Sequence, residues 1–158
     1  MDEIERKFLV KQLPDLSGIQ AIPYERFYLY ADKGVELRVQ QRGDEYELER
    51  KVVIGDLSRS SSICPLSVEE FILLKKLAGK QIIRDSYQLS GNPNASIKIY
   101  HGDYEGLVRA EFEFTSVSEA HSFIPPEWCG TEITDSVLGR DSRLANLTQE
   151  DFQKELRK

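Results

Sequence analysis

Glu3, Glu5 and Lys7 lie two residues apart at the start of the sequence, in a stretch where charged and apolar side chains alternate. Successive side chains of a β-strand point to opposite faces, so these three would share one face, and Ile4 and Phe8 the other. Two carboxylates about 7 Å apart along a strand can bind a hard divalent cation. A lysine one step further could bind an anion beside that cation. The alternative interpretation is an edge strand whose charged face meets water.

The same alternation recurs in four later segments, at 35–42, 46–52, 84–89 and 109–114. Each segment has an apolar face and a polar face, and the polar faces carry both signs of charge. Their polar members are Glu36, Arg38, Gln40, Arg42, Glu47, Glu49, Lys51, Arg84, Ser86, Gln88, Arg109, Glu111 and Glu113. Two architectures fit this pattern: an antiparallel sheet with its polar face in water, and a closed barrel with a polar interior and helices over its apolar outside.

Other elements are predicted between and after these strands. A strand is expected at 24–31 and a turn at 32–34. Residues 67–70 form a capping box that opens a helix. The apolar stripe expected to bury this helix consists of Phe71, Ile72, Leu74, Leu77 and Ala78. A short helix is expected at 118–123 and a last helix from Thr148.

The composition fits one cytoplasmic domain of α+β type spanning residues 1–158. A chain of 158 residues can bury a usable core. Its formal net charge of −6 excludes the general basic field typical of nucleic-acid-binding proteins. No apolar run approaches the length of a membrane span, and the charged residues in the first seven positions predict that no signal peptide is present. The oligomeric state stays open.

The pattern Glu3-x-Glu5-x-Lys7, which runs directly into Phe8-Leu9-Val10, resembles the N-terminal signature of the CYTH superfamily. These triphosphate tunnel metalloenzymes include class IV adenylyl cyclases, thiamine triphosphatases and inorganic tripolyphosphatases. Further segments resemble family blocks in the family's order: Glu36-Leu37-Arg38-Val39, the strand from Tyr46 to Lys51, Arg59 after the turn at 55–58, Arg84 ahead of Asp85-Ser86-Tyr87, 106–114 and 128–135. The resemblance runs from residue 3 to about residue 145.

This resemblance implies an eight-stranded antiparallel β-barrel, a tunnel with helices packed outside. It implies a site for Mg²⁺ or Mn²⁺ formed by Glu3, Glu5, Glu111 and Glu113. It also implies substrate binding by cations from separate strands, namely Lys7, Arg38, Lys51, Arg59 and Arg84. No residue is assigned as a general base.

The activity implied is that of a triphosphatase, a phosphoric anhydride hydrolase acting on a triphosphate-containing small molecule. Inorganic tripolyphosphate is the leading substrate. The alternatives are a nucleoside or thiamine triphosphatase, an adenylyl cyclase, and a catalytically weak protein that binds polyphosphate or a nucleotide.

Several positions depart from the family pattern. Gln40, Ser61 and Ser86 stand where the family tends to carry charged residues, and Lys98 stands where an acidic residue is common. These differences predict a thinner cationic wall and slower turnover. Lys98 is expected at the surface or the rim. Glu132 matches a family position and is expected to have either a metal-related or a structural role.

Overall fold

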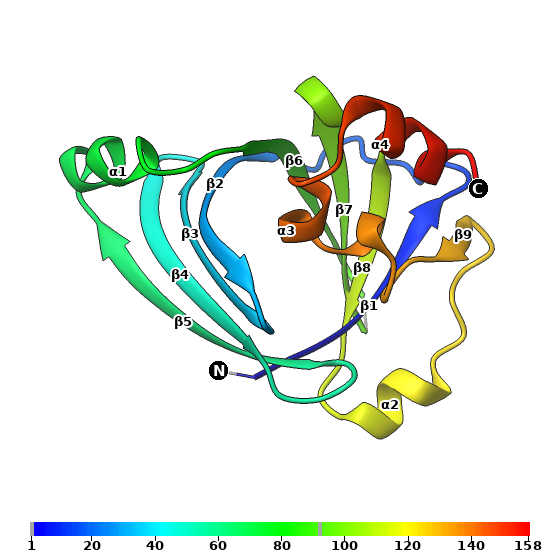
Figure 1. The fold of residues 1–158 in the computed structure, drawn as a ribbon. Coiled ribbons are helices and arrows are strands. Elements are labelled where there is room, and N and C mark those ends of the chain that lie inside the picture. Colours follow the sequence, from blue (N-terminus) through cyan, green and yellow to red (C-terminus); the bar gives the residue numbers. More distant parts are fainter. Residues whose placement is uncertain (1, 92) are drawn as a thin grey trace.

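The alternating side chains build nine strands that form one sheet (Figure 1). The computed structural model describes residues 2–91 and 93–158. The strands are β1 (Asp2–Val10), β2 (Ile22–Asp32), β3 (Val35–Arg42), β4 (Glu45–Val53), β5 (Ser58–Leu66), β6 (Gln81–Leu89), β7 (Asn94–His101), β8 (Val108–Glu113) and β9 (Cys129–Glu132). The pairings between neighbouring strands are antiparallel.

The sheet closes on itself through β1. Residues 5–9 of β1 pair with β8, and residues 2–4 pair with β5 at the other end of the order β5-β4-β3-β2-β6-β7-β8-β1. The predicted eight-stranded antiparallel barrel is therefore confirmed. The sequence did not predict β9, which pairs with residues 8–10 of β1, beyond the segment that pairs with β5.

A tight turn fixes the register of β2 and β3. Lys33 and Gly34 have positive φ angles of 50° and 76°, and they separate the paired residues Asp32 and Val35. A two-residue turn with positive φ at both positions matches the right-handed twist of a hairpin. The turn predicted at 32–34 is confirmed. A register shift between Tyr28 and Tyr30 then places Arg38 of β3 opposite Tyr28 of β2.

Within the described residues, four α-helices and two short 3₁₀ turns complete the fold. They are α1 (Val68–Lys75), α2 (Val117–Ser122), α3 (Asp141–Leu144), α4 (Gln149–Leu156), η1 (Gly102–Tyr104) and η2 (Val137–Gly139). The capping box at the start of α1 is confirmed, because Ser67 and Glu70 bond each other's backbone N–H groups. The short helix α3, which the sequence did not predict, lies in the opening of the barrel (Figure 1).

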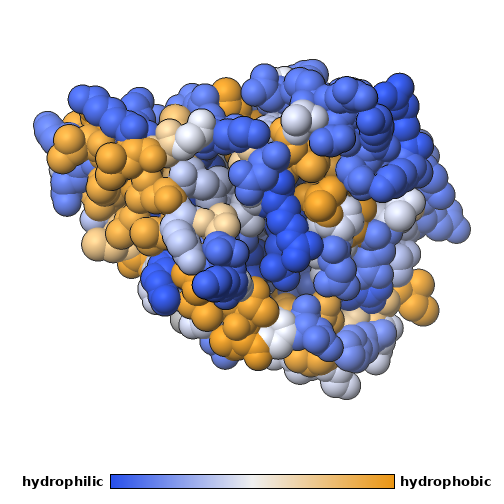
Figure 2. Space-filling view, viewed as in Figure 1, coloured by the Kyte–Doolittle hydropathy of each residue, from blue (hydrophilic) through white to orange (hydrophobic). Residues whose placement is uncertain are grey.

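The apolar stripe predicted for α1 is wrong. Phe71 is the buried residue of this helix and packs between the rings of Phe27 and Tyr46. Ile72 and Leu77 are 44% and 76% exposed. Figure 2 shows an apolar surface at the α1 end of the molecule. The helix contacts the barrel edge mainly through one side chain, so most of its apolar residues face outward.

The hydrophobic core lies outside the barrel wall rather than inside it. One cluster, which includes Ile97, Phe112 and Ala120, lies between the wall and α2. The other, which includes Leu138 and Phe152, lies under η2 and α4. Because the apolar faces of the strands turn outward to these helices, the polar faces turn inward.

None of the helices in the described part of the chain is long and apolar enough to cross a membrane.

Candidate active site

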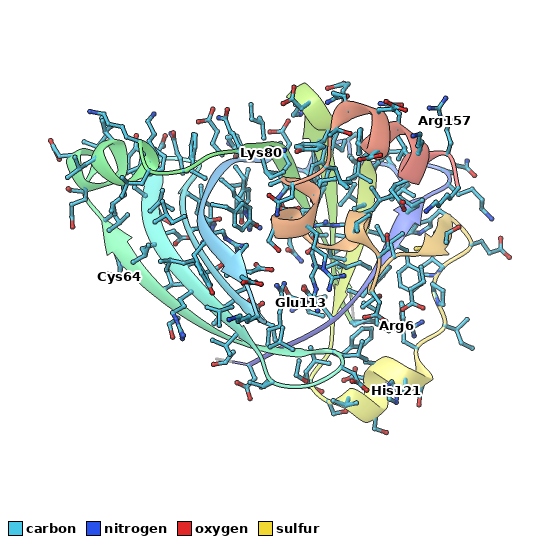
Figure 3. The ribbon with its side chains drawn as sticks, viewed as in Figure 1. Arg6, Cys64, Lys80, Glu113, His121 and Arg157 are labelled. Carbon is cyan, nitrogen blue, oxygen red and sulfur yellow. The ribbon has the colours of Figure 1, made fainter. Side chains whose placement is uncertain are left out.

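The inward faces of the strands enclose a polar cavity of about 180 Å³. Its wall contains all the side chains that the sequence predicts for the metal and the substrate: Glu3, Glu5, Lys7, Arg38, Lys51, Arg59, Arg84, Glu111 and Glu113. Figure 3 shows Glu113 within the opening of the barrel and Arg6 on the side of β1 toward α2. The inward placement of these side chains is confirmed, and their binding roles remain predictions.

The register of β1 determines which of these charges face each other. Glu5 lies directly opposite Glu113 of β8, and Lys7 lies directly opposite Glu111. Like charges directly opposite each other on a sheet are destabilising. A cation that approaches both carboxylates of the Glu5–Glu113 pair would therefore reduce their repulsion.

Cations of the tunnel hold three of the four predicted metal ligands. The pairs are Glu3 with Lys51 at 2.5 Å, Glu5 with Lys7 at 3.0 Å and Arg59 at 3.2 Å, and Glu111 with Arg109 at 2.6 Å and Arg84 at 3.5 Å. Glu113 has no basic group within 4.0 Å among the residues that the structure describes. It is the carboxylate whose charge is left uncompensated.

The pKa values of these carboxyl groups follow their partners. Burial raises the pKa of Glu5, but Lys7 and the other nearby cations outweigh burial and lower it to about 2. The same balance, with Arg109 as the main cation, holds the pKa of Glu111 well below its usual range. Burial raises the pKa of Glu113, and the charges of Glu5, Glu3 and Glu111 raise it further. The site thus combines two firmly ionised carboxylates with one that holds its proton more tightly.

The donor set fits a hard divalent cation. Four carboxylates meet on one wall of the cavity, and carboxylate oxygen is the ligand that Mg²⁺ and Mn²⁺ prefer. Among residues 2–91 and 93–158, no group of three or more acidic, histidine or cysteine side chains is already arranged to hold a metal ion. Lysine and arginine side chains contact three of the four carboxylates, namely Glu3, Glu5 and Glu111. A metal ion would have to replace them.

A second charged cluster surrounds Asp141, at the start of α3. Arg26, Arg84 and Arg109 lie 3.1, 3.3 and 3.2 Å from its carboxylate oxygens. The Tyr100 hydroxyl donates a hydrogen bond to it at 2.5 Å. Burial raises the pKa of Asp141, but the three arginines outweigh burial and hold it well below its usual range. This carboxylate fixes three tunnel arginines at once.

The sequence pattern contains a signal for part of this second cluster. Arg26 shares the inward face of β2 with Tyr24 and Tyr28, and Arg109 shares the inward face of β8 with Glu111. Strand parity therefore could have placed both arginines in the tunnel. Asp141 lies in a four-residue helix, where no periodic pattern can indicate which way a side chain points.

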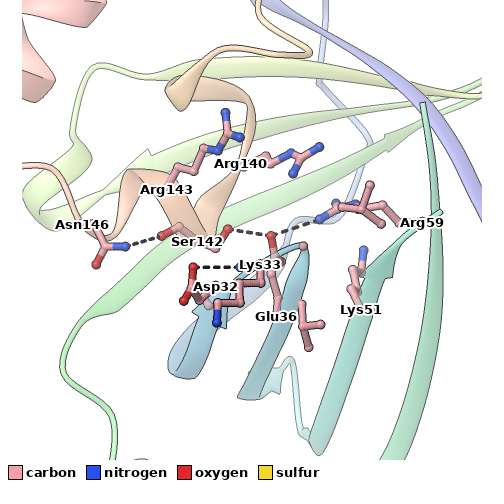
Figure 4. A pocket seen from close by; sticks show the side chains of 13 residues that line it. Asp32, Lys33, Glu36, Lys51, Arg59, Arg140, Ser142, Arg143 and Asn146 are labelled. Atoms are coloured by element: carbon pink, nitrogen blue, oxygen red, sulfur yellow. Dashed lines mark hydrogen bonds and ion pairs between the residues drawn. The ribbon is translucent and has the colours of Figure 1, made fainter. Parts of the chain in front are cut away.

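A basic pocket of about 240 Å³ adjoins the cavity (Figure 4). Lys51, Arg59 and Glu36 line both spaces, so the pocket forms a mouth of the tunnel. Arg140 and Arg143 line it on the α3 side (Figure 4). Burial together with the charges of Arg59 and Arg143 lowers the pKa of Arg140. This excess of positive charge would attract a polyanion toward the tunnel.

Two proteins named inorganic triphosphatase are similar to this chain over nearly its whole length. The one from Nitrosomonas europaea is 34% identical over 149 residues, which cover 92% of this chain and 97% of that protein. The chain belongs to the CYTH superfamily of triphosphate tunnel metalloenzymes. The one from Acetivibrio thermocellus is 29% identical over 155 residues, 96% of this chain and 97% of that protein. The chain matches no protein-family model.

Solved structures agree with the CYTH assignment. The crystal structure of the inorganic triphosphatase NE1496 has a TM-score of 0.69 and 30% identity, covering 92% of this chain and 98% of that chain. A candidate adenylate cyclase from Bacillus halodurans has a TM-score of 0.56 and 15% identity, covering 85% of this chain and 96% of that chain. At that identity the second likeness shows the fold alone.

The prediction that Lys98 lies at the surface or the rim is wrong, because Lys98 lies inside the CYTH tunnel. Its side chain is only 8% exposed and lines the cavity. On β7, Lys98 alternates with two isoleucines that face the outer core, so strand parity outweighs the departure from the family pattern. Its Nζ donates a hydrogen bond to Ser86 Oγ at 2.7 Å. Burial lowers the pKa of Lys98 to about 7. Lys98 thus brings a basic nitrogen to Ser86 from the neighbouring strand.

Three further glutamates, for which the sequence left inward and solvated positions equally open, also face the CYTH tunnel. They are Glu36, Glu47 and Glu49. Arg38 pairs with Glu49, and the Gln40 amide donates to Glu47. Arg42 lines the cavity from an exposed position. The wall near β3 and β4 is therefore a network of opposite charges rather than a purely cationic surface.

Glu132 lies outside the CYTH tunnel and has a structural position. The Arg6 guanidinium donates to both of its carboxylate oxygens, at 2.7 and 2.9 Å. The Thr134 hydroxyl donates to it at 2.9 Å. The hydrogen bond from Arg6 lowers the pKa of Glu132. These contacts tie β9 to β1.

Glu132→Gln is expected to leave metal affinity and any hydrolysis unchanged. The Arg6–Glu132 pair is partly exposed to solvent, so its loss should lower the free energy of unfolding by about 1 kcal/mol or less. Urea unfolding and titration with Mn²⁺ measure the two effects. A variant that loses Mn²⁺ affinity would place Glu132 in the metal site and contradict this assignment.

Proposed function

We propose that the protein hydrolyses inorganic tripolyphosphate to phosphate and pyrophosphate, with Mg²⁺ or Mn²⁺. The observation that carries the proposal is the closed barrel whose interior brings cations and carboxylates from most of its strands onto one narrow cavity. The similarity to two proteins named inorganic triphosphatase supports the same activity.

The lining of the cavity favours an inorganic substrate over an organic triphosphate. Sites for organic ligands are mostly apolar and aromatic. Among the described side chains on this cavity, Ile63 is the one aliphatic residue. The ring of Tyr24 is already covered by Arg26, Arg84 and Lys98, whose charged groups lie 5.2–5.6 Å from its centroid. An adenine or thiamine ring would find little apolar surface in this space.

The tunnel cations would bind the substrate by exchanging partners. Arg38 and Lys51 now pair with carboxylates, and phosphoryl oxygens are equivalent acceptors for these groups. Transfer of Lys7, Lys51 and Arg59 to phosphoryl oxygens would likewise release Glu3 and Glu5, which could then hold the metal ion with Glu113. Transfer of Arg84 would leave Glu111 with Arg109 alone. Such an ion polarises a phosphoryl oxygen and neutralises charge in the transition state. The substrate would take cations away from the carboxylates, and the metal ion would take carboxylates away from the cations. Each should therefore favour binding of the other.

In the reaction, the oxygen of a water molecule forms a bond to the terminal phosphorus. The bond from that phosphorus to the bridging oxygen breaks, and the bridging oxygen leaves with pyrophosphate. One proton of the water stays on the phosphate product and the other passes to pyrophosphate. The tunnel cations stabilise the charge that develops on this leaving group, and fixed donors of this kind commonly contribute about 100-fold or more each to the rate.

Phosphate release from tripolyphosphate, ATP and thiamine triphosphate in parallel tests this function. We expect release from tripolyphosphate with Mg²⁺ or Mn²⁺, at least about 10-fold faster than from the organic triphosphates, which need a ring platform. EDTA should abolish it. Binding of tripolyphosphate without release under any of these conditions would indicate a binding protein. Faster release from ATP or thiamine triphosphate would contradict the inorganic substrate.

A further inference from the structure

Lys98 differs from the other buried cations of the tunnel in its surroundings. The others each have a carboxylate oxygen within 4.0 Å: Lys7, Arg26, Arg38, Lys51, Arg59, Arg84 and Arg109. Among the residues that the structure describes, no carboxylate lies within that distance of Lys98 Nζ. An ammonium group buried without an anionic partner is unfavourable.

The neighbours of Lys98 increase this imbalance. Arg26, Arg84 and Arg109 face it with positive charge, and Glu111 is the main negative charge that reaches it. Glu111 is already held by Arg109 at 2.6 Å. This part of the cavity therefore has an excess of positive charge and would accept an anion.

Ser86 fixes the direction of the ammonium group. It lies directly opposite Lys98 in the pairing of β6 with β7 and is itself buried. The hydrogen bond from Nζ to Ser86 Oγ is 2.7 Å long and uses one of three N–H donors. Lys98 lines the cavity, where its Nζ lies 5.6 Å from the centroid of the Tyr24 ring.

We propose that Lys98 binds a phosphoryl group of the triphosphate, and that Ser86 positions its ammonium group for this contact. The assignment rests on the proposed function, since it requires a polyanionic substrate in the tunnel. In the family pattern a charged residue stands at the Ser86 position on β6. In this protein the cation comes from Lys98, directly opposite on β7.

Lys98→Met tests the proposal because binding and stability should change in opposite directions. Tripolyphosphate titrated into the metal-free protein in EDTA should bind roughly 10- to 100-fold more weakly, the effect of losing a charged hydrogen bond. The melting temperature of the free protein should rise, because an unpaired buried charge has been removed. Lys98→Arg, which keeps the charge, should bind within a few-fold of wild type. A fall in both affinity and melting temperature in Lys98→Met would indicate a structural lysine and overturn the proposal.

Exchanging the lysine and the serine between positions 86 and 98 provides a second test, which does not depend on one variant. Lys98→Ser should lose affinity, and the double variant Ser86→Lys with Lys98→Ser should recover most of it, because directly opposite side chains start only about 5 Å apart. Arg38→Gln serves as the reference for the proposed function. If it weakens binding while the Lys98 variants do not, only the Lys98 assignment fails. If wild-type protein does not bind tripolyphosphate, both proposals fail.

Discussion

Glu113→Gln is expected to slow Mg²⁺-dependent hydrolysis of tripolyphosphate by about 100-fold or more, the usual effect of removing one electrostatic group from a phosphoryl or acyl transfer site. Glu113 is the proposed metal ligand that has no basic partner within 4.0 Å among the described residues, so it is the one most available to a metal ion. Its loss should also weaken Mn²⁺ binding in a calorimetric titration.

The same substitution should stabilise the metal-free protein. It removes the repulsion between Glu113 and Glu5, which lie directly opposite each other. A like-charge pair of this kind costs about 0.2 to 1 kcal/mol, which corresponds to about 0.4 to 4 °C in melting temperature for a chain of this size.

The sign of the pH dependence follows from the raised pKa of Glu113. The folded protein binds this proton more tightly than the unfolded chain does. The stability that protonation contributes is therefore present at low pH and is lost as the pH rises through the folded-state pKa. The advantage of Glu113→Gln should thus be largest near neutral pH and vanish below the usual glutamate range of about 4.

Glu150→Gln on α4 is the matched control, because it makes the same chemical change in an exposed side chain far from the tunnel in the fold. It should change neither the rate nor the affinity. A Glu113→Gln variant with wild-type Mn²⁺ affinity would rule out Glu113 as a metal ligand.

Asp141→Asn is expected to lower the free energy of unfolding by about 3 to 5 kcal/mol, the cost of removing one partner from a buried ion-pair cluster. The substitution keeps the shape of the side chain but removes the negative charge that lies within 3.3 Å of Arg26, Arg84 and Arg109. Arg26 would then have no carboxylate within 4.0 Å among the described residues, and Arg84 and Arg109 would share Glu111 alone.

Urea unfolding near neutral pH measures this loss, with Asp44→Asn in the exposed β3–β4 turn as control. The pKa of Asp141 is lowered in the folded state. Its contribution to stability is therefore complete above the usual aspartate range of about 4 and is lost as the pH falls through the folded-state pKa. The difference between wild type and Asp141→Asn should shrink only in strong acid. An Asp141→Asn protein as stable as wild type at pH 7 would show that the arginines find other partners.

Strand parity explains why much of the tunnel could be predicted from the sequence. Glu3, Glu5, Glu111 and Glu113 belong to strands whose opposite faces are apolar apart from Arg6, and the period of two fixes which way each side chain points. Parity alone left an open sheet and a closed barrel as equal alternatives. The resemblance to the CYTH superfamily decided between them, because closure depends on long-range pairing of β1 with β5 and β8.

The errors have identifiable causes. Lys98 was expected at the surface because it departs from a family pattern, although its own strand alternates and points it inward. Asp141 was missed because a helix of four residues is too short to show a periodic pattern of apolar and polar side chains. The stripe on α1 was wrong because the helix meets only the edge of the barrel and buries Phe71 alone. Local pattern predicts direction within a strand but not what lies across from it.

The most direct test of the central claim is phosphorus NMR of tripolyphosphate incubated with the protein and Mg²⁺. We expect tripolyphosphate to disappear as orthophosphate and pyrophosphate appear in equal amounts. We also expect the reaction to stop in EDTA and to be slowed about 100-fold or more in Glu113→Gln. The proposed metal-dependent hydrolysis would be contradicted if tripolyphosphate stayed intact with wild-type protein and Mg²⁺. It would also be contradicted if conversion continued unchanged in EDTA.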